Sequence, residues 1–323
     1  MGMFPDGLPS EATACHMSKG KEMAGRMSAF TDKFRKKMPD SATEIISVDG
    51  KAMRGTLYEN GRNPDIVSAY SLHSGFTLTT DVCKEKSDEI KAVPKLLDKV
   101  DISGCLVTAD AMSFQKSIID KIREKGVDFV IELKANQSSL RYGLEDNIKT
   151  ATPTDTYMEG PYLEHRIESR TCRIFRGEEL IADKEKRGGN LTVIEILTST
   201  EKKPDGKVTS EQRLYVASIN SSAEYLSLIT RRHWAIERMH WDLDRNLRQD
   251  NIKRKTERAT RNLDTIQRVV PALFAIWKNK RKKMSDKRKG TAEIARELSF
   301  GFTKLVHFLA QNEKKVFDIF VIF

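Results

Sequence analysis

Residues 44–50, EIISVDG, contain the pattern from which the fold can be worked out. The largely apolar run Ile45–Val48 predicts a short strand, Glu44–Val48, and Asp49-Gly50 predicts the turn at which this strand ends. The same pattern returns at Cys105–Thr108, which is followed by Ala109-Asp110. Each of the two predicted strands therefore ends at a carboxylate, on the side of an open α/β sheet where ligands bind.

The residues around these two strands alternate between strand and helix patterns up to about residue 150. A hairpin is predicted first, because two β-rich runs, Asp65–His73 and Phe76–Lys84, flank Ser74-Gly75. Helices are predicted at 88–100, 113–125 and 137–149, with strands at 105–108 and 128–134 between them. An antiparallel meander followed by strand–helix units is the order of an RNase H-like sheet. The predicted fold class is therefore α/β, an RNase H-like mixed sheet with flanking helices.

The second half of the chain begins with a β-rich stretch at 158–220, which we interpret as an insertion before the last helices. Its predicted strands are Arg166–Phe175, Leu191–Thr198 and Arg213–Ser218. A long helix is predicted at 222–249, and a further helical run extends to about Trp277. Proline lacks the amide hydrogen that a helix needs, so Pro271 should kink or interrupt this second run.

The composition favours a polyanionic partner without proving one. The 56 Lys and Arg against 46 Asp and Glu give a net charge of +10, and the basic excess is concentrated again at 278–289. Basic residues bind nucleic acid by releasing its counterions, but an ordinary basic protein is an equally good explanation of charge alone. Four cysteines without a CxxC pair favour a reduced, cytoplasmic compartment. Because no apolar run reaches about 18 residues, no membrane span is expected.

The carboxylates Asp49 and Asp110 should lie close together if their strands are neighbours in the sheet. Like charges at that distance repel, and a divalent cation such as Mg²⁺ with its oxygen ligands is the usual resolution. The alternative is that each aspartate simply begins a turn or caps a helix.

The long helix at 222–249 offers a third carboxylate. Its apolar arc is formed by Tyr225, Ile229, Ile236, Met239, Leu243 and Leu247. The flank of this arc carries His233, Glu237, Asp244 and Arg248, and the opposite side carries Arg231, Arg238 and Arg245. Docking the arc on the sheet would bring Glu237 to the sheet's rim and leave the arginine stripe to meet DNA. A solvated face with Glu237 in a surface ion pair is the alternative, and a zinc site at His233, Glu237 and His240 lacks the H-E-x-x-H order.

At this point the sequence resembles a known family, the insertion-sequence transposases of the H-repeat-associated type (the ISAs-one family). The similar segments are ISVDGKAMRG at 46–55, EKSDEI at 85–90, TADAMSFQ at 108–115, LKANQ at 133–137 and RHWAIERMHW at 232–241. They occur in the family's order over about residues 9–277. The resemblance implies a DDE transposase, which cleaves and transfers DNA strands in a metal-dependent reaction.

Carried over position by position, the resemblance makes Asp49, Asp110 and Glu237 the catalytic and metal-binding residues. It implies two Mg²⁺ or Mn²⁺ ions, which activate the attacking oxygen and stabilise the leaving oxygen. The implied partner is double-stranded DNA with terminal inverted repeats, bound by a homodimer in the bacterial cytoplasm at the nucleoid. The expected DNA-binding residues are Lys51, Arg54, Lys134, Asn136, Arg231, Arg238 and Arg245. Related transposases carry Arg and Lys where this chain has His233 and Asp244, so those two roles are not transferred.

The family pattern also suggests how the chain is divided. The expected parts are the remnant of an N-terminal region at 1–40, the first part of the catalytic domain at 41–157, the β-rich insertion at 158–220, helices that complete the catalytic domain at 221–277, and a basic tail at 278–323. The family usually has a longer region before its first aspartate, so an N-terminally truncated copy is expected. Two other functions stay open, an inactive DNA-binding remnant and an RNase H-like nuclease without strand transfer.

Overall fold

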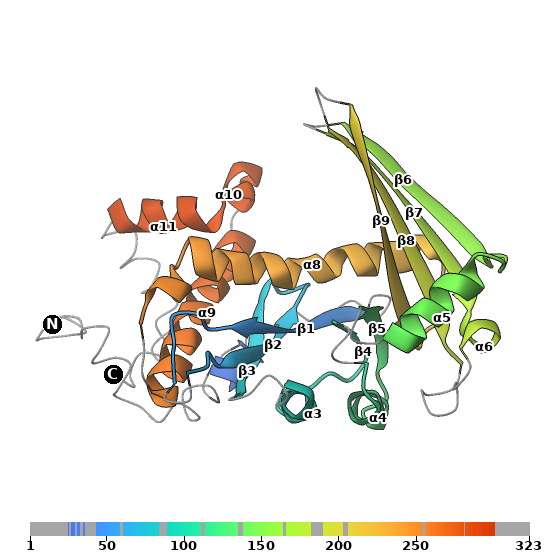
Figure 1. Ribbon diagram of the computed structural model, residues 1–323. Coiled ribbons are helices and arrows are strands. Elements are labelled where there is room, and N and C mark those ends of the chain that lie inside the picture. Colours follow the sequence, from blue (N-terminus) through green and yellow to red (C-terminus); the bar gives the residue numbers. More distant parts are fainter. Residues whose placement is uncertain are drawn as a thin grey trace, which may run out of the picture. The chain divides into compact units, whose positions relative to one another are not determined.

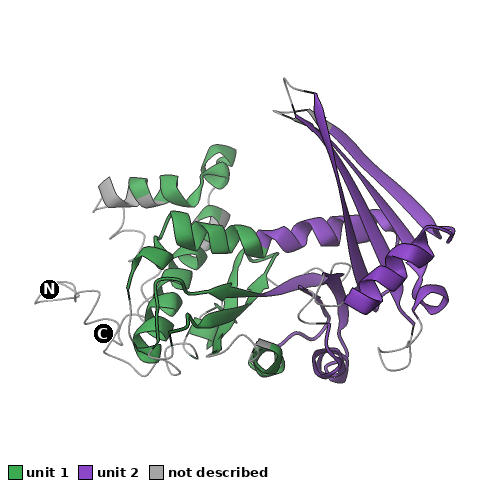
Figure 2. Ribbon diagram, in the orientation of Figure 1, with its two compact units in different colours: residues 1–39, 50–100, 236–323 green, residues 40–49, 101–235 purple. Residues whose placement is uncertain are grey.

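The computed structural model describes ten stretches of the chain, at 43–58, 61–83, 89–110, 114–134, 138–163, 166–181, 190–202, 206–253, 256–280 and 282–300, together with residues 25, 27–29, 31, 32 and 35. The chain forms two compact units (Figure 2). The first unit comprises residues 1–39, 50–100 and 236–323, and the second comprises residues 40–49 and 101–235.

The strands of the described residues form a sheet in the order β3-β2-β1-β4-β5-β9-β8-β7-β6. Their bounds are β1 Glu44–Ala52, β2 Asp65–Ser71, β3 Phe76–Cys83, β4 Cys105–Ala109, β5 Asp128–Leu133, β6 Asp155–Leu163, β7 Arg166–Arg176, β8 Thr192–Lys202 and β9 Lys207–Ala217. The α-helices, labelled in Figure 1, are α3 Glu89–Asp98, α4 Lys116–Glu124, α5 Ser138–Ile148, α6 Gly177–Leu180, α8 Ala223–Arg245, α9 Glu257–Lys280, α10 Met284–Arg288 and α11 Thr291–Phe300. A short 3-10 helix, η4 Gln249–Asn251, lies between α8 and α9.

The strand order confirms the predicted RNase H-like mixed sheet. β2 and β3 form an antiparallel hairpin, whereas β1, β4 and β5 are parallel neighbours. β9 then pairs antiparallel with β5, and β8, β7 and β6 continue the sheet as antiparallel neighbours. A meander followed by parallel strand–helix units was the order expected from the sequence. The β-rich stretch supplies the strands that extend the sheet beyond β5.

The parallel strands form the core of the second unit. All five residues of β4 are buried, as are five of the six residues of β5. Parallel strands are apolar throughout because both faces of their sheet are covered. α4 packs against β5 and buries Ile118, Ile119 and Ile122, the residues predicted to form its apolar face. In the first unit, α3 packs on β2 and β3, and α9 packs on β3.

Two sequence predictions differ from the structure. β1 does not end at Asp49-Gly50 but continues to Ala52, so Asp49 lies within the strand. α9 runs from Glu257 to Lys280 with Pro271 inside it, and the predicted interruption is therefore wrong. The helix continues through Pro271 because Val269, Ala272 and Leu273 are buried around the proline, and such packing outweighs one lost hydrogen bond. In the described part of the chain, no helix has both the length and the apolarity that crossing a membrane requires.

Candidate catalytic carboxylate site

Asp49 and Asp110 are level with each other on neighbouring parallel strands. The register of β1 and β4 pairs Ser47 with Thr108 and Val48 with Ala109, so the two aspartates are the next pair. Neighbouring strands lie about 4.8 Å apart in the hydrogen-bonding direction. Both aspartate side chains are half-buried. The structure thus brings together the two aspartates that the sequence pattern singled out.

Lys134, the first residue after β5, joins this pair. Its Nζ lies 2.8 Å from Oδ2 of Asp110 and 3.7 Å from Oε2 of the buried Glu132. Burial by itself lowers the pKa of Lys134, but the hydrogen bond and charge of Asp110, then the charges of Glu132 and Asp49, raise that pKa above its ordinary value. One ammonium group therefore lies in the field of three carboxylates, and it is protonated at neutral pH.

The donor chemistry at this edge of the sheet fits a divalent cation. Asp49 and Asp110 supply carboxylate oxygens, the ligands that Mg²⁺ prefers, and Lys134 already places positive charge on one of them. Among the residues that the structure describes, no three His, Cys, Asp or Glu side chains are arranged to hold a metal ion. Asp49 and Asp110, with the buried Glu132 nearby, are the carboxylates that the second unit contributes at this place.

Glu237, the third expected carboxylate, belongs to the first unit. It is exposed on α8, one helical turn after His233. Its neighbours Ile236, Met239 and Leu243 are buried in a cluster against which Tyr70 and Leu247 pack. The buried residues Ile236, Met239 and Leu243 belong to the predicted apolar arc, and Glu237 is exposed because it lies on the flank of that arc.

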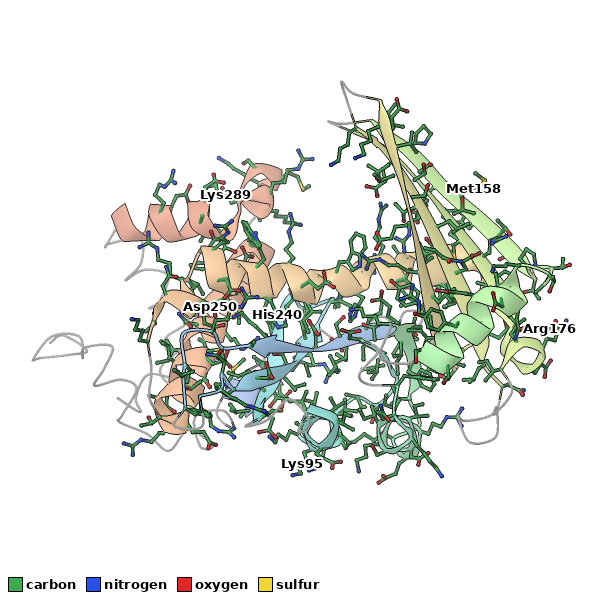
Figure 3. All side chains as sticks on the ribbon, viewed as in Figure 1. Lys95, Met158, Arg176, His240, Asp250 and Lys289 are labelled. Carbon is green, nitrogen blue, oxygen red and sulfur yellow. The ribbon has the colours of Figure 1, made fainter. Side chains whose placement is uncertain are left out.

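Lys51 has a different environment from the one expected of a phosphate-binding residue. Its side chain is buried, and its Nζ lies 2.7 Å from Asp244 and 3.1 Å from Asp250, the latter labelled in Figure 3. The segment after β1 lies so close to Ile252 that a Cβ at Gly55 would be only 2.5 Å from the carbonyl oxygen of Ile252. We therefore assign Lys51 a structural role. The side chain of Arg54 is exposed, while its backbone N–H donates to Asp250.

The arginine stripe of α8 is divided in its contacts. Arg231 is half-buried and pairs with Glu159 at 2.8 Å and with Glu168 at 3.0 Å, which occupies its guanidinium within the second unit. Arg238 and Arg245 are exposed. Asn136 lies outside the described residues, as does most of the EKSDEI segment. Of the expected DNA-binding residues, Arg54, Arg238 and Arg245 are exposed, whereas Lys134 and Arg231 are half-exposed and already ion-paired.

Sequence reasoning missed a buried polar group beside the aspartates. Oγ of Ser47 and Oγ1 of Thr108 lie 2.8 Å apart, and Thr108 Oγ1 lies 2.9 Å from Nδ1 of His233. The available signal was the spacing, because each hydroxyl precedes a carboxylate by two residues, the repeat that returns a strand side chain to the same face. Glu132 was also missed, although a charged residue inside the apolar strand DFVIEL is unusual enough to mark a site.

Comparisons with known proteins agree with the resemblance drawn from the motifs. The family model "Transposase DDE domain" matches residues 40–267. YncI of Escherichia coli O157:H7, which has a provisional transposase name, is 27% identical over 300 residues, 90% of this chain and 77% of that protein. The H repeat-associated protein YhhI of Escherichia coli K12, also provisionally named a transposase, is 28% identical over 268 residues, 78% and 69% of the two chains.

A solved structure of piggyBac transposase in a synaptic complex with hairpin DNA is also similar, at 13% identity and a TM-score of 0.46. The match covers 85% of this chain and 56% of the piggyBac chain, and the fold assignment rests on the strand order instead. The family model spans well over half of the sequence and includes Asp49, Asp110 and the helix with Glu237. The chain therefore belongs to the transposase DDE domain family.

Proposed function

We propose that this chain cleaves DNA phosphodiester bonds and transfers the resulting strand ends in a metal-dependent reaction, with Asp49, Asp110 and Glu237 as the catalytic carboxylates. The observation that carries the proposal is the register of β1 and β4, which makes Asp49 and Asp110 neighbours at one edge of the sheet. Membership of the transposase DDE domain family supports the reaction class. Glu237 enters by its place in the RHWAIERMHW segment.

Asp49, Asp110 and Glu237 would hold the metal. Their oxygen ligands suit Mg²⁺ or Mn²⁺, and we expect two such ions. When bound, such ions would supply an activated nucleophile and would stabilise the leaving oxygen of the phosphodiester. No side chain of the protein needs to form a covalent bond to DNA in this reaction, unlike in enzymes with a nucleophilic residue.

Lys134 supports the site as a fixed positive charge. Because the pKa of Lys134 is raised by Asp110, Glu132 and Asp49 despite burial, the ammonium keeps its proton at neutral pH and is no candidate for a general base. It instead offsets the repulsion between Asp49 and Asp110 in the free protein. A lysine ammonium also has three donor hydrogens, so Lys134 can keep Asp110 and still donate to a DNA phosphate.

We propose double-stranded DNA bearing terminal inverted repeats as the substrate. The exposed cations Arg54, Arg238 and Arg245, with Lys134 beside the aspartates, are the residues we expect to contact its phosphates. Contacts of this kind position a protein on DNA without reading its sequence, and they weaken as the salt concentration rises.

The test is a cleavage assay with the purified chain, Mg²⁺ or Mn²⁺, and DNA that carries the inverted repeats. Asp110→Asn should lower the cleavage rate by more than the about 10- to 100-fold that is typical of losing a residue behind a metal ligand, because it removes a charged ligand while keeping the shape. The matched control is Asp120→Asn, a change of an exposed aspartate on α4 that should leave the rate unaltered. Equal cleavage by Asp110→Asn and the unchanged chain would refute the proposal. Cleaved ends that are never joined to a second DNA would assign a nuclease instead.

A further inference from the structure

The strands that carry Asp49 and Asp110 are cross-linked by a buried chain of polar side chains. Ser47 and Thr108 are register partners on β1 and β4, and their hydroxyl oxygens lie 2.8 Å apart. The hydroxyl of Thr108 also lies 2.9 Å from Nδ1 of His233 on α8. Ser47, Thr108 and His233 are 0%, 1% and 4% exposed. Three side chains from three elements thus form one hydrogen-bonded group shielded from water.

The position of this group relative to the carboxylates follows from strand geometry. Side chains two residues apart in a strand lie on the same face, about 6.6 Å apart along it. Ser47 therefore shares its face of β1 with Asp49, and Thr108 shares its face with Asp110 when the alternation of β4 continues by one residue. The two hydroxyls lie one repeat behind the carboxylates on the strands that carry them.

His233 extends the group to α8. Residues four apart on a helix lie on the same side, so the side chain of Glu237 follows that of His233 after one turn. The imidazole also fits the chemistry of the chain. A hydroxyl has one donor hydrogen and two acceptor lone pairs, so Thr108 can bond Ser47 and His233 at once in either histidine tautomer.

Stability alone does not call for a polar chain at this place. The adjacent residues Ile46 and Val107 are fully buried and apolar, and apolar side chains at 47 and 108 would satisfy the packing without any hydrogen-bond requirement. A buried polar group costs free energy unless all of its bonds are made, and it therefore selects the one arrangement that makes them. Hydrogen bonds of this kind fix angles as well as distances.

We propose that Ser47, Thr108 and His233 are positioning residues that fix Asp49, Asp110 and the turn of α8 before Glu237 in the arrangement needed to bind the catalytic metal. This inference rests on the proposed function. The three residues act through the carboxylates and touch neither metal nor DNA. Supporting residues behind metal ligands typically change metal affinity or activity by about 10- to 100-fold when they are removed.

The experiment compares Thr108→Val, which keeps the side-chain shape and removes both hydrogen bonds, with Thr108→Ser, which keeps the hydroxyl. Mn²⁺ affinity is measured by electron paramagnetic resonance without DNA, and cleavage, DNA affinity and thermal unfolding are measured in parallel. Thr108→Val should weaken Mn²⁺ binding and cleavage about tenfold or more, with DNA affinity unchanged. Thr108→Ser should retain both within about threefold. The matched control is Ser68→Ala on β2, a fully buried serine whose hydroxyl has no hydrogen-bond partner in the described part of the chain.

A double variant tests whether the group acts as a unit. If Thr108 and His233 act through their shared bond, Thr108→Val combined with His233→Phe should be little worse than the worse single variant. If the losses of the two single variants in Mn²⁺ affinity and cleavage rate multiplied in the double variant, the proposed positioning role would be contradicted. A Thr108→Val protein that binds Mn²⁺ like the unchanged protein would also contradict it. Those results leave the proposed function standing if Asp110→Asn still abolishes cleavage. If the unchanged protein neither bound Mn²⁺ nor cleaved DNA, both the proposed function and the positioning role of Ser47, Thr108 and His233 would be overturned.

Discussion

The two halves of α8 differ in the balance of their polar and apolar contacts. Residues 223–235 make a series of polar contacts within the second unit, which join Ser227 to Glu159, Thr230 to Arg170, Arg231 to Glu159 and Glu168, and His233 to Thr108. Residues 236–245 instead bury Ile236, Met239 and Leu243 in the first unit, where Tyr70 and Leu247 pack against them. The first half also buries Leu226 and Ile229, and the second half also pairs Asp244 with Lys51, so the two halves differ in the balance of polar and apolar contacts.

The difference separates positioning from stability. Apolar packing tolerates small shifts and substitutions of similar volume, whereas hydrogen bonds between buried groups are lost when an angle changes. The polar half belongs to the same unit as Asp49 and Asp110, whose carboxylates need a defined geometry to bind metal. We infer that the first half of α8 contributes chiefly geometry and the second half chiefly free energy of folding.

The largest expected effect on stability comes from the apolar half. Leu243 is fully buried, so Leu243→Ala should lower the free energy of unfolding by about 2–5 kcal/mol. Leu243→Met, which keeps the volume, should cost less than about 1.5 kcal/mol. Urea unfolding measures both changes. A loss below about 1 kcal/mol for the alanine variant would show that this half is not the stabilising one.

The polar half should show a smaller loss of stability. Glu159 accepts hydrogen bonds from Ser227 and Arg231, and Glu159→Gln removes the charge from both contacts while keeping the shape. Hydrogen bonds to charged groups contribute about 1.5–3 kcal/mol, so a loss of about 1–3 kcal/mol is expected. The control is Glu224→Gln, an exposed glutamate in the first turn of the same helix, with a change within about 0.5 kcal/mol.

The same variant sharpens the comparison when catalysis is measured on the folded protein. If the polar half sets geometry, Glu159→Gln should slow DNA cleavage more per unit of lost stability than Leu243→Ala does. Equal slowing at equal loss of stability would assign both halves the same role. Thermal unfolding of each preparation confirms that the comparison is made on folded chains.

The sheet could be predicted from the sequence because its signals are local. The apolar runs before Asp49 and Asp110 and the alternation around Ser74-Gly75 are each contained within a few residues. The order of these signals along the chain indicated the order of the elements. The pair of aspartates followed from the same local signal, since residues at the ends of neighbouring parallel strands meet at one edge of the sheet.

The fate of the basic residues could not be predicted in this way. Lys51 and Lys134 each lie near the end of a strand in the parallel set, and both were expected to bind phosphate. Lys51 is buried and pairs with Asp250, which lies 199 residues away in the sequence. Lys134 follows β5 and pairs with Asp110, which follows the neighbouring strand β4. Arg231 likewise finds Glu159 and Glu168 in the inserted strands. Such partners are set by the folded chain, so no local pattern distinguishes a structural cation from one that contacts DNA.

The smallest expected effect concerns Tyr70, which packs on the apolar half of α8. Burial, and then the negative charge of Asp242, raise the pKa of Tyr70 to about 12 from an ordinary value of 10.0. A pKa raised in the folded state means that the stabilising contribution is complete below pH 10 and is lost as the pH rises from 10 towards 12. By pH 11 the unfolded tyrosine is mostly ionised and the folded one is not, which corresponds to about 1 kcal/mol.

Tyr70→Phe should therefore lose less stability than the unchanged chain between pH 8 and pH 11, by about 1 kcal/mol in urea unfolding. The difference between the two proteins cancels the deprotonation of lysines, which affects both of them alike. Tyr142→Phe, a change of an exposed tyrosine on α5, is the control and should follow the unchanged chain. If Tyr70→Phe also followed the unchanged chain, the phenol would be exposed to water, and the apolar half of α8 would be less well sealed than its buried cluster indicates. If it diverged as expected, the phenol of Tyr70 would be shown to be buried with the apolar cluster of α8 and to resist ionisation there.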